Sequence, residues 1–260
     1  MHRVPPFDAG YAWFLDIDGT LLDIAAVPSA VRARPSDTQL LTSLYALSRG
    51  ALALISGRSI AGIDAIFAPL RLPAAGQHGT ERRDARGRER RHPVPEAELR
   101  QAAAQLEAFA ARHEGLLFED KGASLAVHYR LAPALGGVVH ATMRRLAVRL
   151  GPSVEVQSGK LLAELKPAGR NKGHAIEAFL TEPPFRGRVP IFLGDDVTDE
   201  HGFEVVNRRG GLSVKIGAGP SLARWRLRDA AAVRAWLAHG IAAAQKKGEP
   251  QKMGQEPISG

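Results

Sequence analysis

Residues 14–22 read Phe-Leu-Asp-Ile-Asp-Gly-Thr-Leu-Leu, an apolar run that leads into two aspartates two positions apart. Residues i and i+2 of a strand point to the same side, so Asp16 and Asp18 meet at the end of a buried strand. Gly19 permits a sharp turn there, and Thr20 offers a hydroxyl. Carboxylates this close repel each other unless a cation or a shared proton compensates. The spacing favours Mg²⁺, which prefers hard oxygen ligands, or a pair that attacks phosphorus and moves a proton. An aspartate-rich turn is an equally good interpretation of this stretch alone.

Hydrophobic periodicity predicts an alternation of strands and helices on either side of the middle of the chain. Strands are expected at residues 12–15, 51–55, 189–193 and 212–216, and helices at 36–47, 60–67, 174–180, 200–206 and 230–237. Such alternation predicts an α/β protein with a doubly wound parallel sheet. Ligands of such sheets gather at the carboxyl ends of the strands, where Asp16, Ser56 and Asp195 fall.

The middle of the chain has a different pattern. Long amphipathic helices are expected at 96–113 and 138–150, with strands at 125–130, 154–157 and 161–165. Together they predict a compact α+β unit that lies over the sheet. Prolines near residues 93–95 and 167 punctuate the chain on either side of it. The predicted organisation is a discontinuous core of residues 1–90 and 166–244, an inserted unit of residues 91–165, and a disordered tail at 245–260.

Composition limits the chemistry and the partners. The 260 residues include no cysteine, so a metal must sit on aspartate, glutamate, histidine or carbonyl oxygen. The net charge of +8 includes an arginine-rich stretch from Arg82 to Arg91. Because Asp84 and Glu89 interrupt it and no aromatics interleave, we favour a solvated hairpin over a nucleic-acid site. No signal peptide or membrane span is evident, so a cytoplasmic protein without membrane or nucleic-acid partners is expected.

Four polar stretches follow apolar segments in an order that suits a phosphate site. The first is Asp16 to Thr20, and the second is Ser56-Gly57-Arg58, whose hydroxyl and backbone N–H groups can hold phosphate oxygens. The third, Asn171-Lys172-Gly173, opens a helix and supplies a fixed positive charge. The fourth, residues 194–200, carries four acidic side chains on one short loop. Each is an ordinary turn or helix cap when taken alone. Together they favour a phosphate-and-magnesium site.

These four stretches resemble the signature set of haloacid-dehalogenase-type phosphatases, which share a Rossmann-like core and a mobile cap. The chain is more similar still to the trehalose-6-phosphate phosphatase family, over residues 12 to about 237. The stretches that carry this closer resemblance are 76–79 (GQHG), 56–58 (SGR), 194–200 (GDDVTDE), 205–208 (VVNR), 119–122 (EDKG), 128–130 (HYR) and 159–167 (GKLLAELKP). The implied fold is a Rossmann-like doubly wound core with an inserted α+β cap domain.

The resemblance implies roles for individual core residues. Asp16 would attack phosphorus and form an aspartyl-phosphate, while Asp18 would protonate the leaving sugar oxygen and then activate water. Ser56 and Lys172 would hold the phosphoryl oxygens and offset their charge. Further implied substrate contacts are Thr20, Gly57 and Arg58.

The implied magnesium ligands are Asp16, the Asp18 carbonyl, Asp195 and Asp196. Asp199 is an alternative to Asp196, acting directly or through water. A phosphomonoester dianion repels a carboxylate nucleophile, so Mg²⁺ and a lysine are needed to neutralise the site.

In the implied cap, Glu119, Lys121 and Glu164 would hydrogen-bond sugar hydroxyls when the cap closes. The bland alternative for Glu119 and Lys121 is a surface ion pair. His78 could contact a ligand or pack in a turn, and His128 fits a structural role better.

The activity that the resemblance implies is Mg²⁺-dependent release of trehalose from its 6-phosphate, downstream of a trehalose-phosphate synthase. Sucrose-phosphate or mannosyl-phosphoglycerate phosphatases would share the chemistry and differ in the cap. A basic nucleic-acid-binding protein and a phosphotransferase or mutase remain alternatives at this point.

Overall fold

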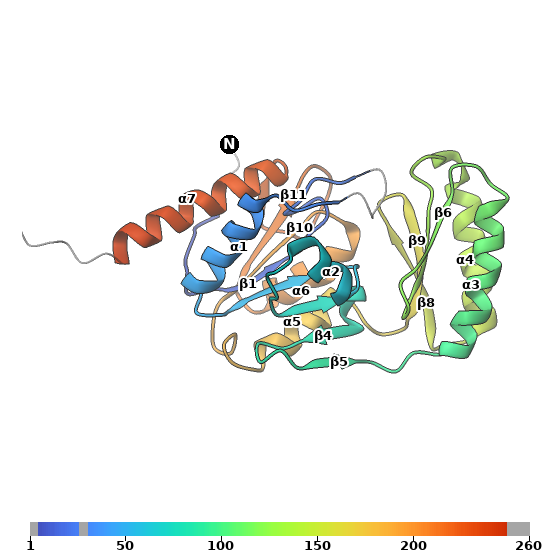
Figure 1. Cartoon of the computed structure of the whole chain (residues 1–260), viewed down its shortest axis with the longest axis horizontal. Coiled ribbons are helices and arrows are strands. Elements are labelled where there is room, and N and C mark those ends of the chain that lie inside the picture. The colour runs from blue at the N-terminus through green and yellow to red at the C-terminus, as the bar shows by residue number, and fades with distance from the viewer. Residues whose placement is uncertain (1–4, 26–30, 249–260) are drawn as a thin grey trace, which may run out of the picture.

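The computed structural model describes residues 5–25 and 31–248 and contains two sheets with helices packed on them (Figure 1). The larger sheet has eight strands in the order β12-β11-β10-β1-β2-β3-β4-β5. Its neighbours run parallel from β12 to β3, and β4 and β5 add an antiparallel hairpin at one edge. Its strands are β1 (Ala12–Leu15), β2 (Leu52–Ile55), β3 (Ala74–Gly76), β4 (Glu81–Arg83), β5 (Glu89–Arg91), β10 (Pro190–Gly194), β11 (Leu212–Ile216) and β12 (Trp225–Leu227).

Alternation along β1 explains why helices cover both faces of the larger sheet. Trp13 and Leu15 point into one apolar core, shared with helices α1, α2 and α7. Ala12 and Phe14 point into a second core, shared with α5 and α6. All four side chains are fully buried, so β1 reads as a continuous apolar run, as a strand covered on both faces does. The helices are α1 (Pro35–Leu47), α2 (Ile60–Phe67), α5 (Lys172–Leu180), α6 (Glu200–Arg208) and α7 (Ala230–Gly248).

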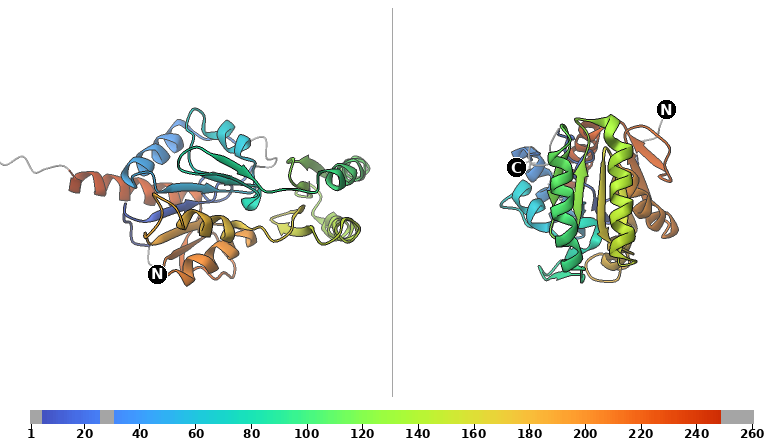
Figure 2. Two further views of the ribbon diagram at one scale, coloured as in Figure 1. Left: turned by 90° about the horizontal axis from the view of Figure 1, so that it is seen from below. Right: turned by 90° about the vertical axis from the view of Figure 1, so that its right-hand side faces the viewer.

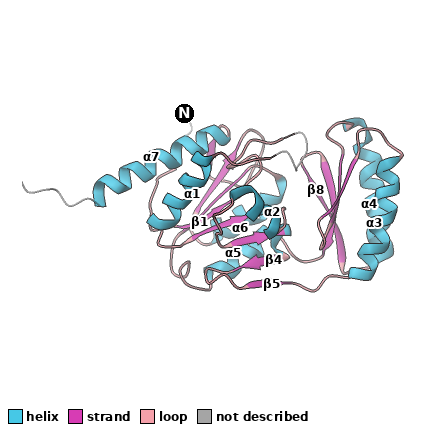
Figure 3. Ribbon diagram, in the orientation of Figure 1, coloured by secondary structure: helices cyan, strands magenta, loops and turns pink. Residues whose placement is uncertain are grey.

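The second sheet belongs to the inserted segment. It has four antiparallel strands in the order β6-β7-β9-β8, with α3 and α4 packed on one face around a third apolar core. Its elements are α3 (Glu96–Ala111), β6 (Leu117–Asp120), β7 (Leu125–His128), α4 (Gly136–Leu150), β8 (Val154–Gly159) and β9 (Leu162–Pro167). The helices lie on the far side, so the uncovered sheet face turns toward the larger sheet (Figures 2 and 3). The predicted fold class, a Rossmann-like parallel core with an inserted α+β cap, is confirmed.

Two sequence predictions about the C-terminal helix were wrong. The helix expected to end at Leu237 continues to Gly248, four residues into the expected tail. Ile241 packs into the core and residues 242–244 are alanines, so burial and high helix propensity extend it. The rest of the expected tail, residues 249–260, lies outside the described residues. None of the helices in the described ranges combines the length and apolar character that crossing a bilayer requires.

The arginine-rich stretch forms the predicted hairpin, β4 and β5, but the prediction that it is solvated holds only in part. Arg83 is 3% exposed; it donates to the Leu72 carbonyl at 3.0 and 2.8 Å and pairs with Asp64 at 2.6 Å. Arg82 lies over the Phe179 ring, with its guanidinium carbon 4.9 Å from the ring centre. Arg82 and Arg83 therefore pack the hairpin against the core, so only part of the arginine-rich stretch faces solvent.

Candidate active site

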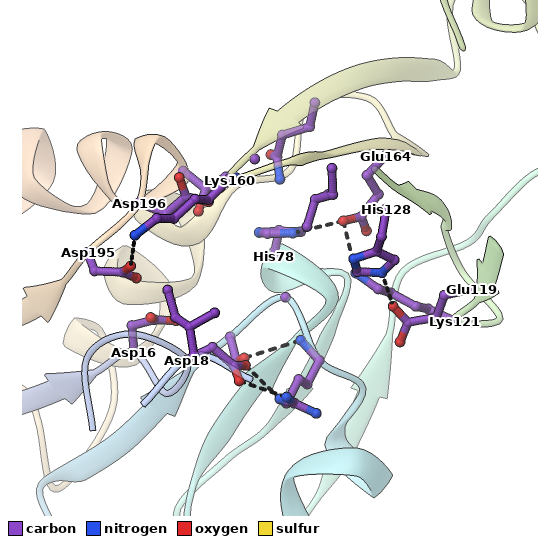
Figure 4. Close-up of a pocket in the computed structure, with 18 of the residues that line it drawn as sticks. Asp16, Asp18, His78, Glu119, Lys121, His128, Lys160, Glu164, Asp195 and Asp196 are labelled. Carbon is purple, nitrogen blue, oxygen red and sulfur yellow. Dashed lines mark hydrogen bonds and ion pairs between the residues drawn. The ribbon is translucent and has the colours of Figure 1, made fainter. Parts of the chain in front are cut away.

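A pocket lies where the carboxyl ends of the central strands face the open side of the cap sheet (Figure 4). Both units contribute polar side chains to its wall. Eleven of the twelve residues predicted as site residues line it: Asp16, Asp18, Ser56, Gly57, Arg58, Glu119, Lys121, Glu164, Lys172, Asp195 and Asp196. The twelfth, Thr20, is fully buried outside the lining, and its hydroxyl has no hydrogen-bond partner among the described residues.

Three aspartates converge at one end of the pocket. Asp16 follows β1 and Asp195 follows β10, and these strands are parallel neighbours, so their ends meet at one edge. Asp199, in the short helical turn after β10, brings a third carboxylate. One oxygen from each lies within 4.8 Å of the others. Gly19 makes room for this cluster, since a Cβ there would stand 2.2 Å from the Asp195 Oδ2 and its φ is +81°.

Lys172 supplies the positive charge of the cluster. It is the first residue of α5, whose N-terminus is capped by the Asn171 side chain. Its Nζ donates to Asp16 Oδ1 at 2.8 Å and to Asp199 Oδ1 at 2.7 Å, and all three side chains are buried. Burial by itself would lower the pKa of Lys172, but the two carboxylates raise it above its ordinary value. The ammonium is therefore a permanent charge.

Lys160 Nζ lies 4.0 Å from Asp195 Oδ2, but the Lys160 side chain is 60% exposed, so it and Lys172 balance the three carboxylates only in part. Burial raises the pKa of Asp16 well above its usual range, and Asp199 and Asp195 add to this although Lys172 opposes it. Burial, followed by the Asp199 charge, raises the pKa of Asp195 to about 7. The cluster thus favours a further positive charge. The atoms that the cluster offers to a metal are carboxylate oxygens near the carboxyl ends of β1 and β10. Such hard donors suit a divalent cation such as Mg²⁺.

The predicted metal ligand of Asp18 is its backbone carbonyl, and the carboxylates of Asp18 and Asp196 both bond groups outside the cluster. Asp18 makes a two-pronged ion pair with Arg58, at 2.6 and 2.7 Å. Asp196 accepts from the Val197 backbone N–H at 2.7 Å and from the Lys160 backbone N–H at 3.2 Å. The carboxylate cluster therefore contains Asp16 and Asp195 of the predicted set, together with Asp199.

A second polar group lines the cap side of the pocket, around Glu164 on β9. Lys121 donates to its Oε2 at 3.0 Å and Ser124 to its Oε1 at 2.6 Å, while His78 Nε2 lies 3.2 Å from Oε2. Burial would raise the pKa of Glu164, but Lys121 and His78 hold it well below its usual range. Burial lowers the pKa of His78 against the pull of Glu164. Glu164 is thus a fixed carboxylate acceptor.

Glu119 pairs with His128 at 2.8 Å beside this group. His78, for which the sequence allows a ligand contact or a packed turn, and His128, which is predicted to be structural, both line the pocket. Gln77 and Ser124 were missed, because nothing in their local sequence shows that a core turn touches a cap turn. The stretch 76–79, noted only for its resemblance, was the available signal for Gln77.

The chain also matches known proteins over most of its length. A family model described as trehalose-phosphatase matches residues 14–231. The chain is 46% identical over 247 residues to a trehalose-6-phosphate phosphatase of Escherichia coli, covering 95% of this chain and 92% of that one. It is 49% identical over 208 residues to a probable trehalose-phosphate phosphatase of Sinorhizobium fredii, covering 80% and 78%. A solved trehalose-6-phosphate phosphatase related protein superposes with a TM-score of 0.77 at 27% identity, covering 90% and 98%.

The charge balance predicts a pH-dependent response to Mg²⁺. The folded pKa of Asp195, about 7, lies above its ordinary value of 3.8, so without a cation the folded chain loses stability as pH rises through that interval. Below a pH of about 7 the folded Asp195 carboxyl carries a proton, which Mg²⁺ must displace. We expect excess Mg²⁺ to raise the melting temperature more at about pH 8 than at about pH 5.5.

Thermal unfolding with Mg²⁺ or with EDTA measures this difference. Asp195→Asn should remove most of the response, whereas Asp84→Asn, at a buried aspartate of the hairpin, should retain it. Equal Mg²⁺ responses of these two variants would contradict the assignment of the cluster.

Proposed function

The chain belongs to the trehalose-phosphatase family, and from that membership we propose that it hydrolyses trehalose 6-phosphate to trehalose and inorganic phosphate. One observation carries the proposal. A single pocket has a lysine and carboxylates suited to a phosphoryl group on its core wall, and charged hydrogen-bonding groups suited to sugar hydroxyls on its cap wall. A phosphorylated disaccharide presents these two chemistries at its two ends.

The core wall supports an acyl-phosphate route. Asp16 Oδ attacks phosphorus as the bond from phosphorus to the sugar oxygen breaks, and Asp18 gives that oxygen a proton. Water then attacks the phosphorus of the aspartyl-phosphate, Asp18 takes its proton, and the bond to Asp16 breaks. Lys172 stays beside Asp16 and offsets the charge that repels the incoming phosphate.

Asp16 and Asp195 are the proposed side-chain ligands of Mg²⁺, with Asp199 next to them. When bound there, the ion would supply Lewis-acid stabilisation of the phosphoryl oxygens. Ser56, which is buried and lines the pocket at the end of β2, is the proposed hydroxyl contact to the same oxygens. In the structure Asp18 accepts from Arg58 with both carboxylate oxygens, so this pair must open before Asp18 can carry the proton that the sugar oxygen receives.

The cap wall is the proposed specificity element. Glu119, Lys121 and Glu164 are fixed by ion pairs before any ligand arrives, so they accept and donate hydrogen bonds at set positions. A site built from buried polar groups rejects ligands that leave those groups unpaired. This supports a particular sugar over a small generic ester. The substrate requires a preceding glycosyl transfer onto a sugar phosphate, so we propose that the enzyme follows a trehalose-phosphate synthase in the cytoplasm.

A substrate panel tests the proposed function. Released phosphate is measured for trehalose 6-phosphate, sucrose 6-phosphate, mannosyl-3-phosphoglycerate, glucose 6-phosphate and p-nitrophenyl phosphate, with Mg²⁺ or with EDTA. We expect kcat/KM for trehalose 6-phosphate to exceed the others by at least about 100-fold, and EDTA to abolish turnover. Preference for another sugar phosphate would overturn the assignment of the substrate. Full activity in EDTA would overturn the requirement for Mg²⁺.

Glu164→Ala separates the cap from the chemistry. The variant loses the buried acceptor that Lys121, Ser124 and His78 surround, but keeps the core wall. We expect kcat/KM to fall about 100-fold or more for trehalose 6-phosphate and less than about threefold for p-nitrophenyl phosphate.

Val148→Ala, at an exposed position on the outer cap helix α4, is the control and should leave kcat/KM for both esters unchanged. If Glu164→Ala lowers the activity on both esters equally, Glu164 supports the fold and does not select the sugar.

A further inference from the structure

The turn after β3 is the feature that the proposed mechanism leaves unexplained. Gln77 and His78 have φ values of +46° and +56°, two consecutive non-glycine residues in the left-handed region. Such a conformation is costly and persists only where surrounding contacts enforce it. Here the Gln77 backbone N–H donates to the Arg58 carbonyl at 2.9 Å, and that of His78 donates to the Ser56 carbonyl at 3.1 Å. The turn is therefore bonded to the proposed phosphate-binding loop.

The Gln77 side chain reaches from this turn into the cap. Its Nε2 donates to the Lys121 carbonyl at 2.7 Å, and its Oε1 accepts from the Ala123 backbone N–H at 3.1 Å. Its second N–H donates to Glu81 Oε1 at 3.1 Å. Gln77 is 1% exposed, so these bonds are made away from water. One amide thus joins the core to the cap turn between β6 and β7.

The orientation of this amide is determined by its partners. Exchanging its oxygen and nitrogen would set a donor against the Ala123 N–H and an acceptor against the Lys121 carbonyl. Ser124 Oγ lies 3.4 Å from Gln77 Oε1 but 2.6 Å from Glu164 Oε1, and a hydroxyl has one hydrogen to give. That hydrogen therefore goes to Glu164. The turn of residues 121–124, which Gln77 contacts, thus carries two side chains that donate to Glu164, those of Lys121 and Ser124.

We propose that Gln77 is a positioning residue for sugar recognition. By holding the turn of residues 121–124 against the core, its amide sets Lys121 and Glu164 at a fixed place relative to Asp16. The proposal rests on the proposed function and deepens it: Gln77 does not line the pocket, so it acts through cap residues that do. His78, which lies next to Glu164 in Figure 4, reinforces the same link.

Kinetics with two esters test this proposal. Gln77→Ala removes the amide, and Gln77→Glu keeps the shape and the acceptor but replaces the N–H donors by an oxygen that faces the Lys121 carbonyl and Glu81. We expect kcat/KM for trehalose 6-phosphate to fall about 10- to 100-fold, mainly through a higher KM. The reason is that Gln77 positions Lys121 and Glu164, which would bind sugar hydroxyls away from the phosphate. For p-nitrophenyl phosphate we expect less than about a threefold loss in the same variants.

The matched control is Gln105→Ala, which removes a glutamine whose side chain bonds Arg149 on the outer surface of the cap. This variant should leave kcat/KM for both esters unchanged. Equal losses on both esters in Gln77→Ala and Gln77→Glu, or no loss on either, would overturn the positioning role.

A distance measurement without any ligand separates this proposal from the proposed function. Because the chain has no cysteine, spin labels can be placed at Val148→Cys on the cap and Leu222→Cys on the core, both exposed positions. We expect one narrow distance distribution with Gln77 or with Gln105→Ala, and a broader, longer one with Gln77→Ala.

Unchanged distributions in Gln77→Ala would overturn the proposal whatever the substrate is. If instead the distributions change but the unsubstituted protein does not prefer trehalose 6-phosphate, the sugar assignment fails while Gln77 still positions the cap. Melting temperatures of all variants show which of them are folded.

Discussion

The ammonium of Lys172, buried between Asp16 and Asp199, is the interaction on which the arrangement of this site depends. An isolated buried carboxylate is costly, and several in one place are tolerated only with matching positive charge. The lysine meets part of that need at the N-terminus of α5. The remaining imbalance, visible in the raised pKa values of Asp16 and Asp195, supports the proposal that the cluster binds a cation and a phosphoryl group together.

The larger sheet makes this convergence possible, and the cap adds a second polar wall to the same pocket. Because β1 and β10 are parallel neighbours, the residues that follow them meet although nearly 180 positions separate them in sequence. The cap sheet leaves one face free of helices, and that face supplies a second, independently fixed set of charges around Glu164. In the proposed function, chemistry and recognition therefore come from different folding units, and the hydrogen bonds of Gln77 join these two units.

Much of this could be predicted from the sequence, for identifiable reasons. Buried parallel strands are apolar runs, and the polar residues after them must share one edge, which places Asp16, Ser56 and Asp195 together. The hairpin was predictable from its turn residues, but the burial of Arg83 was not, since it depends on Asp64 and the Leu72 carbonyl. Likewise, the sequence does not show whether Asp196 or Asp199 joins the carboxylate cluster, because that depends on the conformation of the short turn after β10. The contact of Gln77 with the turn at 121–124 links residues about 45 positions apart, and no local pattern encodes it.

We propose that Asp16 receives the phosphoryl group in a site neutralised by Lys172 and a divalent cation. The most direct test is rapid acid quenching of a single turnover of trehalose 6-phosphate, followed by mass spectrometry of the peptides. We expect one phosphoryl group on the peptide that contains Asp16, formed with Mg²⁺ and absent in EDTA or in Asp16→Asn. A phosphoryl group on another residue, or turnover that persists in Asp16→Asn, would contradict it.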